Sequence, residues 1–190
     1  LQLKDNFSSY YELKSWYRLA WSAYFSGKMQ DAIEACYALF SLPKEGLTQD
    51  EKRLLIRDAA KIISRSFIEI EDIISIKRLV KKRIPNPYWG AVSLSLMNRW
   101  QQENALQKAS DMALWALKND QTSYEFPEIL SQLEKIYEIR GEKEKQRKIL
   151  ERLALLLPED SLWRKVQAKR SLSVTEKIPL MLSANKRLSE

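Results

Sequence analysis

The sequence contains no histidine, and this absence excludes a large part of catalytic chemistry. Without imidazole there is no Ser-His-Asp triad, no Cys-His pair and no histidine metal site. The single cysteine, Cys36, has no second cysteine with which to form an internal disulfide. Because Cys36 lies in a helical pattern beside Tyr37 and Phe40, we expect a buried core residue rather than a reactive thiol.

Turn-forming residues are also scarce, since the 190 residues include only four glycines and six prolines. Strand-rich folds need many turns, and turns depend on these residues. Leu, Ala, Lys, Glu, Gln and Arg, which favour helices, dominate instead. No run approaches the ~18 apolar residues of a membrane span. The sequence therefore predicts an all-α chain, long enough for one domain with a continuous core.

Motifs for enzymatic chemistry are missing as well. The chain has neither a glycine-rich phosphate loop nor metal-ligand spacing. Neighbouring carboxylates occur at Glu69, Glu71 and Asp72 and at Glu142 and Glu144. These acids lie near expected turns and helix starts, where they interact favourably with the helix dipole. We therefore expect no enzymatic activity, no cofactor, no metal and no small-molecule substrate.

The breaks between helical patterns recur about every 35–40 residues, which indicates helical-hairpin repeats. They fall where proline or Asn, Asp and Gly end a helix, at residues 42–46, 84–87, 120–123 and 158–160. We predict four hairpins at about 10–43, 50–84, 88–119 and 126–158, followed by a capping helix at 160–170 that carries Trp163 and Val166. Residues 1–170 would form the repeat domain. Residues 171–190 would be a basic tail or the start of a further repeat.

The first expected hairpin carries a recurring pattern of apolar and small residues. Its positions are Trp16, Leu19, Ala20, Ala23, Gly27, Ala32, Ile33 and Cys36. The spacing gives one apolar stripe on each of two helices, with a turn at Gly27, where a left-handed conformation is easily adopted. A second copy falls at Leu130, Leu133, Tyr137, Gly141, Leu150, Leu153 and Pro158. The two middle copies are degenerate, and Asn104 replaces the turn glycine in one of them.

This pattern resembles the tetratricopeptide repeat, although Ala23 stands where that family usually has Tyr. The resemblance implies a right-handed solenoid in which the first helix of each hairpin lines a concave, protein-binding groove. On the faces that the family uses, the chain presents aromatic, then basic, then amide side chains. They are Tyr17, Trp21, Tyr24 and Phe25; Arg57, Lys61, Ser64 and Arg65; and Asn98, Gln101 and Gln102. Aromatic residues and Arg are typical of binding hot spots. The alternative is that the aromatic residues pack against a preceding repeat.

The net charge of +7 is concentrated near the end of the chain. Residues 164–190 contain seven basic and two acidic residues, and a second basic cluster spans residues 77–83. Solvated helix faces are the plain interpretation of both. Nucleic-acid binding through them is an alternative, since basic patches contact phosphates.

More loosely, the segments Trp-Tyr-Arg-Leu-Ala-Trp and Leu-Leu-Pro-Glu-Asp-Ser-Leu-Trp look like long repeat proteins of Gram-negative envelopes. That resemblance implies a periplasmic scaffold in a motility, secretion or envelope assembly, with the cytoplasm as the alternative compartment. A further alternative is the helical arm of an envelope enzyme such as a lytic transglycosylase. The sequence begins at Leu1 rather than at Met, and we interpret it as part of a longer protein. The main expectation is a non-catalytic scaffold with a protein or peptide partner.

Overall fold

The computed structural model describes the backbone of residues 2–44 and 46–189 and the side chains of residues 11–44 and 46–189. The regular secondary structure of these residues is entirely helical and includes no strand. The elements are α1 (Gln2–Phe25), α2 (Met29–Ser41), α3 (Gln49–Ile70), α4 (Ile73–Arg83), η1 (Asn86–Tyr88), α5 (Trp89–Gln102), α6 (Leu106–Asn119), α7 (Phe126–Ile139), α8 (Lys143–Ala154), α9 (Leu162–Lys169), η2 (Thr175–Lys177) and α10 (Ile178–Ser189). The all-α fold class is therefore confirmed. Leu1 and Glu190, the outer limits of the predicted regions 1–170 and 171–190, lie outside the described residues.

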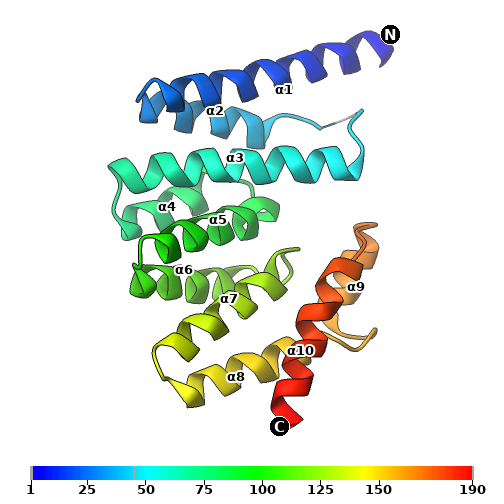
Figure 1. Cartoon of the computed structure of the whole chain (residues 1–190). Coiled ribbons are helices and arrows are strands. Elements are labelled where there is room, and N and C mark those ends of the chain that lie inside the picture. The colour runs from blue at the N-terminus through cyan, green and yellow to red at the C-terminus, as the bar shows by residue number, and fades with distance from the viewer. Residues whose placement is uncertain (1, 45, 190) are drawn as a thin grey trace. The chain divides into compact units, whose positions relative to one another are not determined.

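The chain divides into two compact units, Leu1–Arg99 and Trp100–Glu190, and the division falls inside α5. In the first unit, α1 packs against α2, α2 packs against α3, and α1 also lies against α3 (Figure 1). In the second unit, α6 packs against α7 and α7 against α8, while α10 packs against both α7 and α8. Within each unit, helices thus stack on their sequence neighbours, as in a helical solenoid.

One turn geometry recurs at the ends of four helices. The second residue after the helix has a positive φ at Gly27 (73°), Asn104 (56°), Gly141 (69°) and Ser171 (55°). At each of these turns, the next backbone N–H bonds to a carbonyl five residues earlier, at 2.7–3.0 Å. This bond satisfies a carbonyl that the helix end leaves free. The α3–α4 turn differs, because Glu71 is extended and Asp72 caps α4 through the N–H groups of Ile74 and Ser75.

Small residues fill the packed face between α1 and α2. Ala20 and Ala32 have no exposed surface, in accord with the close helix crossing that the sequence predicts. Leu19 was expected on this buried stripe, but its side chain is 48% exposed. The buried line of α1 runs through Leu13 and Ala20, seven residues apart, and at 3.6 residues per turn Leu19 projects well away from that line.

Cys36 is fully buried, as expected, and its Sγ contacts the backbone carbonyl of Ala59 at 3.6 Å. Burial raises the pKa of the thiol to about 12. The reactive thiolate is therefore scarce in the folded chain at neutral pH.

In the second unit, α9 is fastened to the loop between α6 and α7. The indole N–H of Trp163 donates to the carbonyl of Ser123 at 2.7 Å. Gln167 and Arg170 both donate to the carbonyl of Thr122 at 2.9 Å. Trp163 is 2% exposed, whereas Val166, its expected companion in the cap, is half-buried.

Residues 171–189 form a packed element. Lys177 is buried and forms ion pairs with Glu128 and Glu176, and its ammonium lies 4.4 Å from the centre of the Tyr124 ring. Arg187 pairs with Glu138 at 3.0 Å and with Glu134 at 2.8 Å.

The register of these pairs gives the direction of α10. Lys177 and Glu128 are 49 residues apart, and so are Arg187 and Glu138. A constant offset means that α10 runs beside α7 in the same direction.

Candidate functional site

The candidate site lies where α1 runs beside α3 in the first unit. The hydroxyl of Tyr17 donates to Asp58 Oδ2 at 3.3 Å. Seven residues further along both helices, the guanidinium of Arg65 lies 5.9 Å from the centre of the Tyr24 ring. Both pairs have the same offset of 41 residues, so the two helices run parallel and in register. Each of these helices begins a predicted hairpin, so the structure brings their predicted site residues to one surface.

Three aromatic rings form a cluster at the end of α1. Trp21 and Phe25 stack with a centroid distance of 5.2 Å and an interplanar angle of 17°. Tyr24 meets both rings edge-on, at 6.1 and 5.6 Å. Phe25 is 76% exposed, while Tyr17, Trp21 and Tyr24 are half-buried. The rings contact one another, yet much of the cluster remains open to solvent, which is typical of an interaction surface.

Basic side chains line the neighbouring side of α3. Arg57, Lys61 and Arg65 recur every four residues and are all exposed. Lys61 pairs with Asp58 at 3.0 Å. Among the described residues, no carboxylate lies within ion-pairing distance of Arg57 or Arg65. These two guanidinium groups are therefore available to an acidic ligand.

A hollow of about 240 Å³ lies between α1 and the start of α3. Its lining is Leu13, Lys14, Tyr17, Leu47, Glu51, Leu54, Leu55 and Asp58. Leu54 is 50% exposed, so the hollow offers apolar surface to solvent. Hydrogen bonds from the backbone N–H and the side chain of Thr48 hold the pKa of Glu51 below its usual range, and nearby Lys14 acts in the same direction. The rim of the hollow thus carries an ionised carboxylate.

Sequence reasoning missed this hollow, although a signal was present. Leu54 lies seven residues before Lys61, so both project from one face of α3. A leucine on the same helix face as the basic side chains could have indicated an apolar site there.

The structure corrects one predicted groove residue. Ser64 is fully buried rather than exposed, and its hydroxyl donates to the carbonyl of Val92 in α5 at 3.3 Å. Asn98 and Gln102 are exposed and Gln101 is half-buried on α5. Because the units divide after Arg99, Gln101 and Gln102 belong to the second unit, and the site is confined to α1 and α3. The predicted continuation of the groove through α5 stays a prediction.

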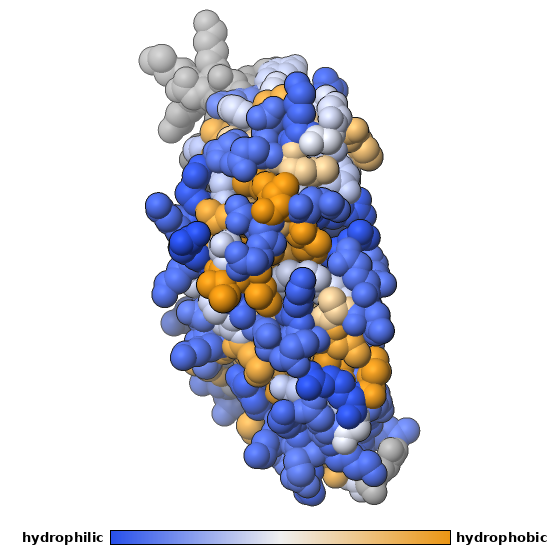
Figure 2. Space-filling view, turned by 90° about the vertical axis from the view of Figure 1, so that its left-hand side faces the viewer, coloured by the Kyte–Doolittle hydropathy of each residue, from blue (hydrophilic) through white to orange (hydrophobic). Residues whose placement is uncertain are grey.

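Exposed apolar residues alone do not mark the site. Figure 2 shows orange apolar patches separated by hydrophilic residues on one face of the molecule. Ile74 and Ile139 are 77% and 70% exposed on α4 and α7. The α1–α3 surface is distinguished by its stacked rings, its available guanidinium groups and its hollow.

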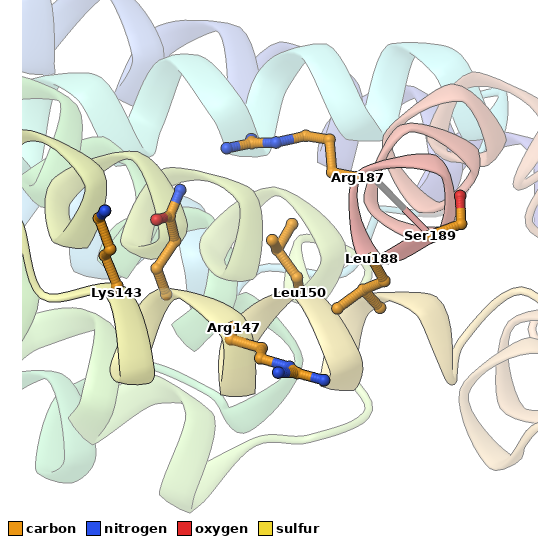
Figure 3. A pocket seen from close by; sticks show the side chains of 7 residues that line it. Lys143, Arg147, Leu150, Arg187, Leu188 and Ser189 are labelled. Atoms are coloured by element: carbon orange, nitrogen blue, oxygen red, sulfur yellow. The ribbon is translucent and has the colours of Figure 1, made fainter.

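A second pocket, of about 490 Å³, lies between α8 and α10. Lys143, Arg147 and Arg187 give it a basic lining, but the side chains of Arg147 and Arg187 point in different directions (Figure 3). Arg187 is already paired with Glu134 and Glu138, and Arg147 with Glu151. The cations therefore do not converge on one ligand position.

Two carboxyl groups in the second unit have raised pKa values. Burial is the largest cause for both Asp120 and Glu125. Arg170 opposes the shift in both, and Lys177 opposes it in Glu125.

Within residues 2–44 and 46–189, no group of three or more Cys, Asp or Glu residues is placed to hold a metal ion.

No protein-family model matches the chain, and no curated protein or solved structure is significantly similar to it. Over the described part of the chain, none of the helices is both long enough and apolar enough to cross a membrane.

Proposed function

We propose that this chain is a non-catalytic protein-interaction scaffold built from tetratricopeptide-like helical hairpins. The observation that carries the proposal is the aromatic cluster of α1 beside the exposed basic side of α3. Aromatic and Arg side chains supply most of the energy at typical protein interfaces. The recurring turn geometry at Gly27, Asn104 and Gly141 supports the repeat assignment, because each falls inside one predicted hairpin.

The surface is suited to binding rather than to catalysis. Trp21, Tyr24 and Phe25 offer contact area with few rotatable bonds, so binding immobilises little side-chain freedom. The resemblance to Gram-negative envelope repeat proteins makes a periplasmic assembly the setting that we propose.

Nucleic-acid binding is less well supported. Several basic residues of segment 164–190 already have partners within the chain: Lys177 and Arg187 pair with carboxylates, and Arg164 donates to the carbonyl of Leu157. On α4, Arg83 pairs with Glu34 at 2.8 Å and stacks over the Tyr37 ring. These contacts reduce the charge available to phosphates.

The test is selection of peptides from a random displayed library on the immobilised chain. Enriched peptides should bind in calorimetric titrations, and Phe25→Ala should weaken that binding by about tenfold. Ile74→Ala is the matched control, because Ile74 has a similar exposed fraction but lies on α4. If no peptide is enriched over the bare matrix, or if both variants bind as the wild type does, the proposal is wrong.

A further inference from the structure

We propose that the α1–α3 surface recognises a short acidic peptide, anchored by one large apolar side chain in the hollow at Leu54 and held by carboxylates at Arg57 and Arg65. This inference rests on the proposed function and specifies the chemistry of its ligand. It draws on two features of α3, namely an apolar hollow and a pair of available guanidinium groups.

The spacing of the two features sets the length of the ligand. Leu54 and Arg65 are eleven residues apart on α3, which is about 16 Å at the rise of an α-helix. An extended peptide covers this distance in about five residues. A helical ligand would need about eleven residues for the same distance. The extended form is the more economical, because fewer residues have to be ordered on binding.

Charge selects an acidic ligand. Residues 57–68 contain three basic residues and one acid, Asp58, and that acid already pairs with Lys61. Arg57 and Arg65 can each form paired hydrogen bonds to a carboxylate, a geometry that Lys cannot reproduce. The Tyr24 ring centre lies 5.9 Å from the Arg65 guanidinium, so an aromatic ring stands beside any ion pair formed there.

The hollow selects the apolar anchor. Four of its lining residues are leucines, and Leu13 is 2% exposed at its base. Filling it removes apolar surface from water on both partners. Tyr17, which lines the hollow, lies four residues before Trp21 of the aromatic cluster, so the hollow and the cluster share one side of α1.

The probes are synthetic six-residue peptides with leucine at one end, one aspartate two residues away to meet Arg57 and a second aspartate at the other end to meet Arg65, made in both orders. Matched peptides replace the aspartates with asparagine or lysine, or the leucine with serine. We expect at least one acidic peptide to bind and both replacements by uncharged residues to weaken it by about tenfold. Binding should also weaken as salt is raised, since exposed charges are screened.

Charge reversal in the protein gives the sharper test. The double variant Arg57→Glu with Arg65→Glu should lose the acidic peptide and gain the lysine peptide. The control Arg78→Glu with Lys82→Glu makes the same change in net charge on exposed residues of α4 and should keep wild-type preferences. Leu54→Ser should weaken binding by about tenfold, while Leu114→Ser, at a leucine of similar exposure on α6, should not. Circular dichroism confirms that each variant is folded.

The outcomes separate this inference from the proposed function. If library-selected peptides bind in a manner that depends on Phe25 but show no preference for acids, the ligand chemistry is wrong and the scaffold function stands. If no peptide of either kind binds, both fail. Concentration-dependent dimerisation that Phe25→Ala abolishes would instead identify a second copy of the chain as the occupant, and would overturn the peptide proposal.

Discussion

The two units each contain a pair of parallel helices, and the pairs differ in what joins them. In the first unit, α1 and α3 keep an offset of 41 residues, with a tyrosine–carboxylate hydrogen bond and a ring–guanidinium contact between them. In the second, the segment of α10 keeps an offset of 49 residues from α7, with ion pairs to α7 from Lys177, just before α10, and from Arg187, near its end. We call α1–α3 the open pair and α7–α10 the closed pair.

The two pairs differ in whether their charged side chains already have partners within the chain. In the closed pair, charged side chains of both helices pair with one another, as Arg187 of α10 does with Glu138 and Glu134 of α7. In the open pair, Arg57 and Arg65 have no such carboxylate partner among the described residues, and Phe25 is largely exposed. Groups that the fold does not use itself are available to a ligand.

Breaking the closed pair should have the largest effect. Lys177→Met leaves the Glu128 carboxylate without its cation in a site where the lysine side chain is 9% exposed. We expect the free energy of unfolding of the second unit to fall by about 3 kcal/mol. Urea unfolding followed by hydrogen exchange in α10 measures the loss. Lys135→Met, an exposed control on α7, should change it little. A double variant with Glu128→Gln should recover part of the stability, and no recovery would mean that the pair is not the cause.

Overpacking beneath the open pair should have the next largest effect. Ala32 is fully buried where α2 packs on α1, so Ala32→Leu forces extra volume into a closed space. The expected cost is about 1–3 kcal/mol. Thermal unfolding measures it, with Ala168→Leu at an exposed site as the control. An unchanged melting temperature would contradict the close crossing.

The helices were predictable from sequence to a large extent, because apolar stripes and turn residues are local signals. Gly27, Gly141 and Asn104 marked three turns, and each has the positive φ that such turns require. The role of the basic residues in segment 164–190 was not predictable. Lys177 and Arg187 counted only as tail charges, since their partners lie 49 residues earlier and long-range pairing leaves no periodic pattern.

The site was predictable only in part, for the same reason. The aromatic positions on α1 and the basic positions on α3 follow from helical periodicity. Which aromatic residue of α1 lies beside which basic residue of α3 depends on how the two helices pack. No local sequence pattern encodes that packing. Ser64 shows the limit, because it shares its part of α3 with exposed Arg65 yet is covered by α5.

Lowering the pH should stabilise the second unit through the buried carboxyl group of Glu125. Burial raises the folded-state pKa of Glu125, so the folded chain takes up this proton more readily than the unfolded chain. The stability from this proton is present below the unfolded pKa and is lost as pH rises through the folded one. Glu125→Gln should therefore stabilise the second unit at pH 7, and the advantage should vanish near pH 4. Urea titrations at several pH values measure the difference. Glu144 is exposed, so Glu144→Gln is the control and its effect on the free energy of unfolding should not change with pH. If the effect of Glu125→Gln is also independent of pH, the Glu125 carboxyl is solvated and the prediction is wrong.

The smallest effect on stability is expected at the open pair itself. Phe25→Ala removes a ring that is 76% exposed, so the free energy of unfolding should change by less than about 0.5 kcal/mol. The same variant should weaken ligand binding by about tenfold, which separates a binding role from a packing role. A loss of several kcal/mol in chemical unfolding would show that the aromatic cluster belongs to the core.

The position of Cys36 allows the packing of the first hairpin on the second to be measured. This thiol is the only one in the chain, and it lies on α2 against the backbone of α3, where one hairpin stacks on the next. A thiol reagent can reach it only when that joint opens, because Cys36 has no exposed surface in the folded chain. In stacked repeats, stability is approximately a sum of internal and nearest-neighbour contributions. The rate of alkylation at Cys36 therefore reports the coupling free energy between the first two hairpins, and a ligand that bridges α1 and α3 should slow it.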